Sequence, residues 1–245
     1  MRMRRLARCL AVGGAAAIAL GAGTAGATTV TFDVLGDSGP TNVAPLGTVT
    51  PSGNANIWTL NAPVSINGAQ INSWSSTLKT DPYVTNNITV TNTSASAQTF
   101  IATVLLPIPA FAYDAVVNSS VGVTVTDSNG NNMMSFDRNG STAIYQGTIN
   151  GATALNLNPP GLPYTTASCS PNPGTAGCSA TGSDGVSFSP AGPGSATQIG
   201  ITLTFNLSPG DSAGLTSRFE IVPEPASAAL LALGLLGLAI TGRRR

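Results

Sequence analysis

The central part of the chain alternates apolar and polar residues in short runs. In 199–207 every second residue is apolar, and 215–221 alternates as well, with Phe219 and Ile221 on one face and Arg218 and Glu220 on the other, which is typical of strands with one buried face. Val121, Val123 and Val125 repeat the pattern and lead into Asp-Ser-Asn-Gly at 127–130, a turn-forming sequence. No run between residues 28 and 222 has both the period and the length of a helix. The pattern therefore predicts an all-β protein.

Further strands follow from weaker runs. The apolar run 100–106 predicts a central strand, and Ile88 with Val90 ends in the polar loop 92–97. Other predicted strands cover 30–34, 57–60, 64–66 and 143–149. Strands that recur every ~8–15 residues imply an antiparallel β-sandwich, either immunoglobulin-like or jelly-roll.

One stretch departs from this pattern. Residues 158–194 contain seven prolines together with many Gly and Ser residues. We expect a long loop with at most one short strand, at 186–188.

Composition and charge narrow the class of protein. Only 8% of the residues are charged, against roughly 25% in typical soluble domains, which favours a secreted β-protein. Histidine is absent, so mechanisms that need an imidazole base or ligand are excluded. Residues 28–222 carry three basic and nine acidic side chains, a net charge of −6. Such a body would repel phosphate, which argues against nucleic acid as a partner.

The N-terminus has the three parts of a secretory signal peptide. Four arginines lie within residues 2–8, an apolar stretch follows over 9–23, and Ala25-Gly26-Ala27 gives the small-x-small cleavage pattern. We expect export through the Sec machinery and cleavage by signal peptidase after Ala27, with Ala25 and Ala27 as the recognised residues. The alternative is an uncleaved membrane anchor.

Two cysteines, Cys169 and Cys178, remain in the exported part. A cysteine pair in an oxidising compartment most simply forms a disulfide, which here would staple the 158–194 loop. A redox or metal pair is the alternative, but the spacing is not CxxC and no third ligand is at hand.

The C-terminus contains three ordered features. Pro223 and Pro225 flank Glu224, so this segment is expected to be extended. The 17 uncharged residues 226–242 would span about 25 Å as a helix, enough for a thin bilayer. The terminal cluster Arg243, Arg244 and Arg245 would act as a stop-transfer signal on the cytoplasmic side. We therefore predict one transmembrane helix, with the body outside.

This arrangement closely resembles the PEP-CTERM sorting signal of exported bacterial proteins. The resemblance covers residues 222–245. It implies a Gram-negative host with exopolysaccharide, and recognition at Pro223-Glu224-Pro225 by an exosortase, a membrane-embedded cysteine protease. It also implies an inner-membrane precursor, loss of the tail, and deposition at the cell surface or in the matrix. The predicted organisation is a signal peptide (1–27), a β-sandwich (28–222) and a sorting signal (223–245). A permanent tail anchor is the alternative.

Candidate binding chemistry in the body is sparse. Four oxygen-bearing residues resemble calcium ligands, but the spacing fits a hairpin turn better; they are Asp127, Asn129, Asn131 and Asp137. The aromatic residues Trp58, Trp74 and Tyr83 could stack on sugars, although core packing is the preferred interpretation for tryptophans in a sandwich. We keep Trp74 and Tyr83 as candidate glycan contacts, and expect no metal, no cofactor and no catalytic residues.

Three functions are compatible with these features. The first is a non-catalytic surface or matrix protein linked to biofilm or exopolysaccharide. The second is a carbohydrate-binding module that tethers the cell to its exopolysaccharide. The third is a secreted glycoside hydrolase that uses two of the nine scattered carboxylates. Low charge and the lack of histidine favour the first.

Overall fold

The computed structural model describes residues 28–37, 39–131, 133–134, 136–137, 142–160, 162, 167–168 and 178–223. These residues form strands joined by short loops, and the described ranges include no α-helix, only the 3-10 turn η1 (Ala44–Leu46). The strands of the sandwich pair in antiparallel fashion. The predicted all-β class is confirmed. The two specific topologies, immunoglobulin-like and jelly-roll, stay predictions.

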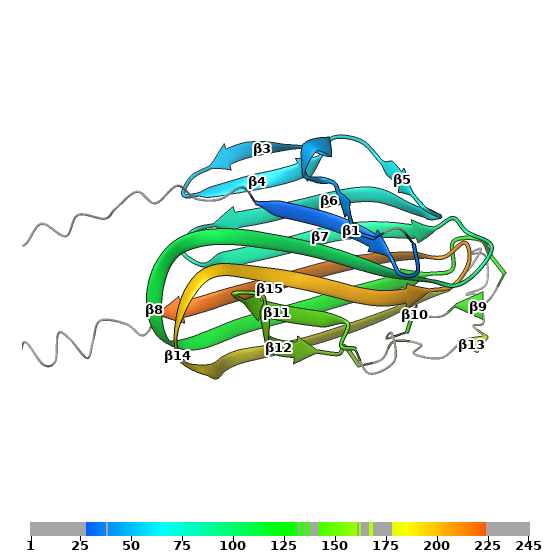
Figure 1. The fold of residues 1–245 in the computed structure, drawn as a ribbon. Helices are drawn as coiled ribbons and strands as arrows, with labels where there is room; N and C mark the ends of the chain where they lie inside the picture. The colour runs from blue at the N-terminus through cyan, green and yellow to red at the C-terminus, as the bar shows by residue number, and fades with distance from the viewer. Residues whose placement is uncertain are drawn as a thin grey trace, which may run out of the picture.

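Strand pairing and Figure 1 define two layers. Across the first layer the order is β12 (Ala152–Leu157), β11 (Tyr145–Ile149), the second half of β14 (Ser179–Leu207), the first half of β8 (Gln98–Thr126), β1 (Thr29–Val34) and β2 (Thr41–Asn42). The short β10 (Phe136–Asp137) pairs with the end of β14.

The second layer is built around the other halves of the two long strands. Its order is the first half of β14, the second half of β8, β15 (Ser212–Pro223), β7 (Tyr83–Asn92), β6 (Ala69–Lys79), β4 (Ala55–Leu60) and β3 (Gly47–Ser52). The short β5 (Val64–Ile66) also pairs with β6. A separate small sheet joins β9 (Met133–Met134) to β13 (Ala167–Ser168).

Strands β8 and β14 belong to both layers. They pair along their whole length, from Gln98 opposite Leu207 to Thr126 opposite Ser179. Figure 1 shows both strands turning back together at one end of the molecule. Register shifts interrupt the ladder at three places within residues 186–198 of β14, which is where the strands turn. The sandwich is therefore one sheet folded over on itself.

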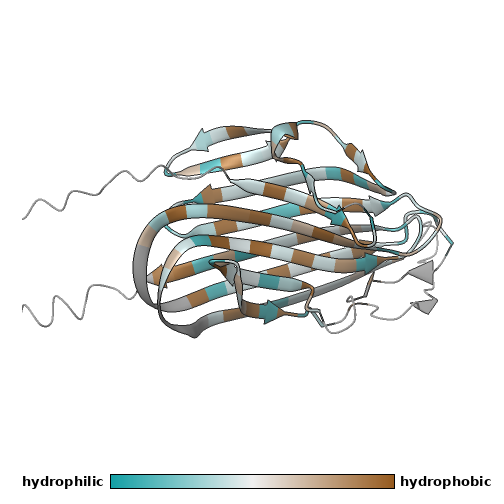
Figure 2. Cartoon of the chain, viewed as in Figure 1, coloured by the Kyte–Doolittle hydropathy of each residue, from teal (hydrophilic) through white to brown (hydrophobic). Residues whose placement is uncertain are grey.

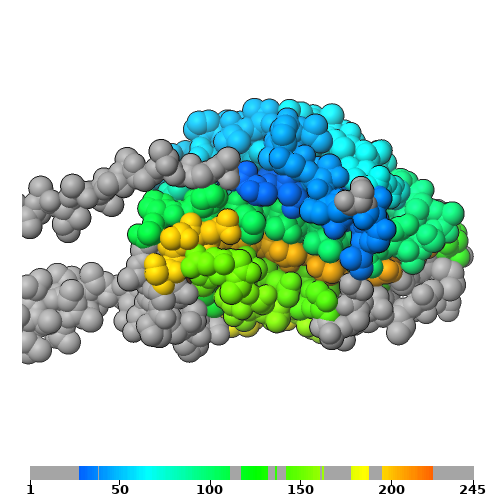
Figure 3. Space-filling view, in the orientation of Figure 1, coloured from blue at the N-terminus to red at the C-terminus, as the bar shows by residue number. Residues whose placement is uncertain are grey.

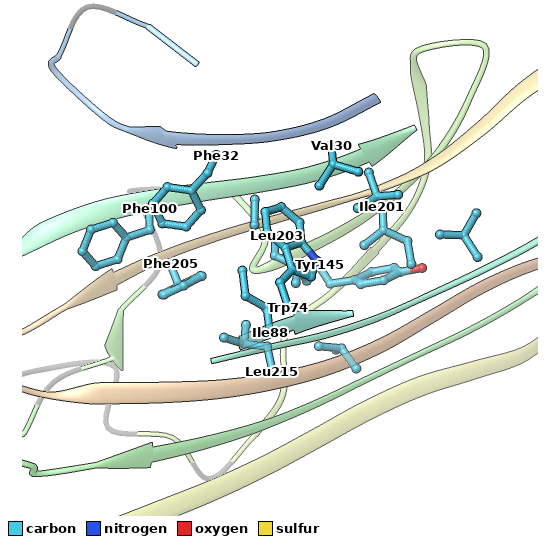
Figure 4. Packing of buried hydrophobic residues seen from close by; sticks show 14 of the residues in the cluster. Val30, Phe32, Trp74, Ile88, Phe100, Tyr145, Ile201, Leu203, Phe205 and Leu215 are labelled. Carbon is cyan, nitrogen blue, oxygen red and sulfur yellow. The ribbon is translucent and has the colours of Figure 1, made fainter. Parts of the chain in front are cut away.

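The core fills the space between the layers. Figure 4 shows buried side chains from both layers pointing toward one another. Phe32 of β1 meets the edge of Trp74 of β6 at a ring-centroid distance of 6.5 Å, and Trp74 meets Trp58 at 5.6 Å. Burial of these large rings is the main favourable term that holds the layers together.

The alternation seen in the sequence is visible along the strands in Figure 2, where hydrophobic and hydrophilic residues follow one another. Figure 3 shows the molecule from the side of the first layer, with β1 near the middle of the view, β3 to β5 above it and the β11–β12 hairpin below it. The outer face of the second layer lies on the opposite side.

One expectation about 158–194 is wrong. Its second part is not a loop, because β14 begins at Ser179 and pairs with β8 from there onward. The inward positions at its start are Ala180, Gly182, Asp184 and Val186, of which only Val186 is a large apolar residue, so the sequence lacks the clear alternation that identifies half-buried strands. Asp184 Oδ2 accepts a hydrogen bond from the Asn158 amide at 2.9 Å and so ties the start of the predicted loop to this strand.

Candidate functional site

The last strand of the sandwich leads directly into the predicted sorting signal. Within β15, Val222 lies opposite Val116 and Pro223 opposite Ala115 in β8. Ile221 is 1% exposed, and its amide donates to the Pro82 carbonyl at 3.0 Å. The folded body thus extends to the first residue of Pro-Glu-Pro.

The other end of the described chain lies close by. Thr29, at the start of β1, pairs with Leu105 of β8, just before the turn of that strand. Figure 1 shows that β1 begins and β15 ends near the same, bent end of the sandwich. Segments that precede and follow the sandwich are therefore attached to one end of it.

Several predicted signal residues lie outside the described residues. They are Ala25, Ala27, Glu224, Pro225, Arg243, Arg244 and Arg245. Within the described ranges, no helix is long and apolar enough to cross a membrane, and the predicted spanning run 226–242 is not among them. Cys169 also lies outside, so its pairing with Cys178 stays a prediction.

The tryptophans belong to the core. Trp58 and Trp74 are 2% and 1% exposed, and the Trp58 indole N–H donates to the Ala44 carbonyl at 3.0 Å. A ring with no exposed face cannot stack on a sugar, so the structure corrects the candidate glycan contact at Trp74.

Tyr83 is partly buried and already has a neighbour on its ring. The Arg218 guanidinium carbon lies 5.2 Å from the ring centroid, a cation–π geometry, and the same guanidinium pairs with Glu220. Arg218 therefore occupies one face of this ring, and a glycan contact at Tyr83 stays a prediction.

The oxygen-rich run after β8 forms a turn. Asp127 Oδ1 accepts a hydrogen bond from the Gly130 amide at 2.8 Å, and Asn129 Oδ1 accepts one from the Asn131 amide at 2.9 Å. The Asn129 amide group donates to the Pro209 carbonyl at 2.7 Å. These side chains stabilise the turn, which agrees with the preferred interpretation. Within the described residues, no three Asp, Glu or Cys side chains come together as a metal site.

Tyr145 is a described residue whose pKa is clearly displaced. Burial raises the pKa of its hydroxyl far above the ordinary value of 10.0, and a hydrogen bond with Ser119 opposes this only partly. The hydroxyl donates to the Arg218 carbonyl at 2.8 Å, so it links β11 in one layer to β15 in the other. Tyr145 therefore has a structural role between the two layers.

The outer face of the second layer has two depressions that the sequence analysis did not predict. One has a volume of about 560 Å³ and is lined by residues of β7, β8, β14 and β15 and by Pro160, which follows β12. The other, of about 310 Å³, is lined by residues of β4, β6 and the segment between β4 and β5. Asn87 of β7 lines both. We call these two depressions, which share Asn87, the cross-strand groove.

Residues 222–245 match the family of the PEP-CTERM protein-sorting motif. The match begins within the last strand of an antiparallel β-sandwich and continues to the end of the chain. It supports an exported protein that an exosortase sorts through its C-terminus. No curated protein is similar enough to the chain to count as a relative.

Proposed function

We propose that the chain is a non-catalytic protein of the cell surface or extracellular matrix of a Gram-negative bacterium. In this proposal an exosortase processes an inner-membrane precursor at Pro223-Glu224-Pro225, and the released sandwich associates with exopolysaccharide. The observation that carries the proposal is the sorting-motif match over residues 222–245.

The position of the motif supports the same function. Strand β15 holds Pro223 against β8, so the sandwich is complete before the sorting residues Glu224 and Pro225 begin. Loss of the tail would therefore leave every described strand of the sandwich in place. Both ends of the sandwich lie at its bent end, so a membrane-held precursor would present the loops at the far end to the surroundings.

The test is to replace Glu224 by Ala and to determine the mature C-terminus by mass spectrometry. We expect the wild-type protein to lose its tail and Glu224→Ala to stay full-length in the inner membrane, because the carboxylate between the two prolines is the proposed recognition element.

Glu220→Ala is the matched control, since it makes the same change four residues earlier, within β15. This variant should be processed normally. A normal mature C-terminus in Glu224→Ala would contradict the proposal.

A further inference from the structure

The cross-strand groove follows one row of side chains across the second layer. Neighbouring strands place these residues opposite one another on the outward face, each with a hydroxyl, an amide or no side chain: Thr59, Ser75, Asn87, Thr216, Gly122 and Ser183. At ~4.8 Å between strands, the row is about 24 Å long. It is a linear array of hydrogen-bonding groups perpendicular to the strands.

Two glycines form the floor of the larger depression. A Cβ atom on Gly214 would meet no atom nearer than Thr89 Oγ1 at 3.9 Å, so open space lies above this residue. At Gly122 the Thr216 hydroxyl lies over the backbone, 2.9 Å from where a Cβ would be. Because glycine has no side chain, these two positions leave a trough bordered by Thr124, Thr181 and Thr216.

Among the described residues, no charged side chain lines either depression. The body around them has a net charge of −6, which disfavours the approach of acidic polymers. The groove therefore fits a ligand that is itself uncharged and offers many hydroxyl groups.

The elongated shape of the groove favours a polymeric ligand over a single small molecule. The two depressions share Asn87 as a lining residue and lie along the same row of side chains, and both are open to solvent. The two tryptophans are buried beneath this face, so hydrogen bonds and not ring stacking would provide the contacts. Individually weak contacts repeated along a polymer give useful retention through multivalency.

We propose that the cross-strand groove binds an extended, uncharged polysaccharide across the strands of the second layer. The inference deepens the proposed function and rests on it for the source of the polymer, which would be the exopolysaccharide met after export.

The experiment measures retention of the purified full chain, in detergent, on three neutral polysaccharides (dextran, mannan and cellulose) and on the anionic alginate. We expect saturable binding to at least one neutral polymer and none to alginate. Absence of binding to all three neutral polymers, or equal binding to alginate, would overturn the inference.

Three variants locate the binding. Gly214→Val places a strand-favouring side chain in the trough, where a Cβ atom has open space, and should weaken binding at least about tenfold. Thr216→Val removes one groove hydroxyl at nearly constant shape and should weaken it about fivefold. Thr153→Val makes the same change at an exposed position of β12, in the other layer, and should leave binding unchanged.

Unchanged binding in both Thr216→Val and Gly214→Val would overturn the assignment. So would a concentration-dependent dimer, seen by sedimentation, that Thr216→Val abolishes, because the groove would then bind a second copy of the chain. The binding experiment can be distinguished from the processing experiment on Glu224→Ala. Polysaccharide binding can fail while the tail is still processed, and processing can fail while binding continues.

Discussion

At the scale of single residues, Gly147 shows how closely the two layers approach. It lies in β11, and a Cβ atom there would be 2.5 Å from the ring of Phe219, a buried residue of β15 in the other layer. The contacting atoms belong to a packed ring that cannot move aside easily. A side chain at this position would push the layers apart.

We therefore predict that Gly147→Ala lowers the free energy of unfolding by about 1–3 kcal/mol. Gly214→Ala is the control, because its Cβ would have open space, and it should be neutral or slightly stabilising. Urea unfolding of both variants makes the comparison. Equal stability of Gly147→Ala and wild type would show that the layers are not this close.

Tyr145 links the layers by hydrogen bonds instead. Its hydroxyl donates to the Arg218 carbonyl at 2.8 Å and lies 3.2 Å from the Ser119 hydroxyl, both in the second layer. Loss of the hydroxyl in Tyr145→Phe should cost about 1 kcal/mol of stability at neutral pH.

The pKa of Tyr145 makes this difference depend on pH. Because burial raises the folded-state pKa above 10.0, the native protein keeps a proton that the unfolded chain releases at higher pH. The stabilisation is complete below pH 10 and falls as pH rises from there toward the folded-state pKa. We expect the advantage of wild type over Tyr145→Phe to be constant from about pH 7 to 9 and to shrink by up to about 1.4 kcal/mol per pH unit above about 10. A constant advantage up to about pH 11 in urea unfolding would refute the pKa argument.

At the scale of elements, clear alternation predicted strands correctly. The runs 199–207 and 215–221 lie in β14 and β15, and 100–106 lies in β8 between β1 and β14, as a central strand should. Strand β6 was missed because a register shift between Ile71 and Ser73 changes the phase of its buried positions. Its buried Ser76, which donates to Asn86 at 2.5 Å, also weakens the apolar pattern.

The first half of β14 could not be predicted for a different reason. Residues 179–187 are mostly Ser, Thr, Gly and Ala, and their place in the sheet comes from the partner strand β8 and not from their own hydrophobicity. Sequence patterns report burial, so a polar strand at the edge of a layer resembles a loop.

Hydrogen exchange can distinguish a strand from a loop in residues 179–186. Since this part of β14 pairs with β8 in the described residues, about every second amide in 179–186 should be protected. The loop 94–97, which belongs to no strand, is the control and should exchange quickly. Uniformly fast exchange across 179–186 would contradict the strand.

The cross-strand groove also lay beyond sequence reasoning. Asn87 and Thr216 are 129 positions apart in the chain and become neighbours only through the register of β7 with β15. Exposed Thr and Ser residues look alike in a sequence, and only the paired strands show which of them share a row. Aromatic residues are the usual indication of a sugar site, but the two tryptophans of this chain are buried in the core.

At the scale of the whole molecule, the position of the sorting motif was predicted correctly because the motif is linear. Its recognition depends on the order Pro-Glu-Pro, apolar run and arginines, and the family match covers the same residues, 222–245. The function of the sandwich depends on surfaces assembled from distant segments, which no linear motif in the sequence reports.

The paired course of β8 and β14 has a consequence for how quickly the protein forms. Their pairs join residues between 53 and 109 positions apart, from Thr126 with Ser179 to Gln98 with Leu207. Contacts so distant along the chain make folding slow. A newly made chain would stay unfolded for longer, which would favour its export across a membrane as an unfolded polypeptide.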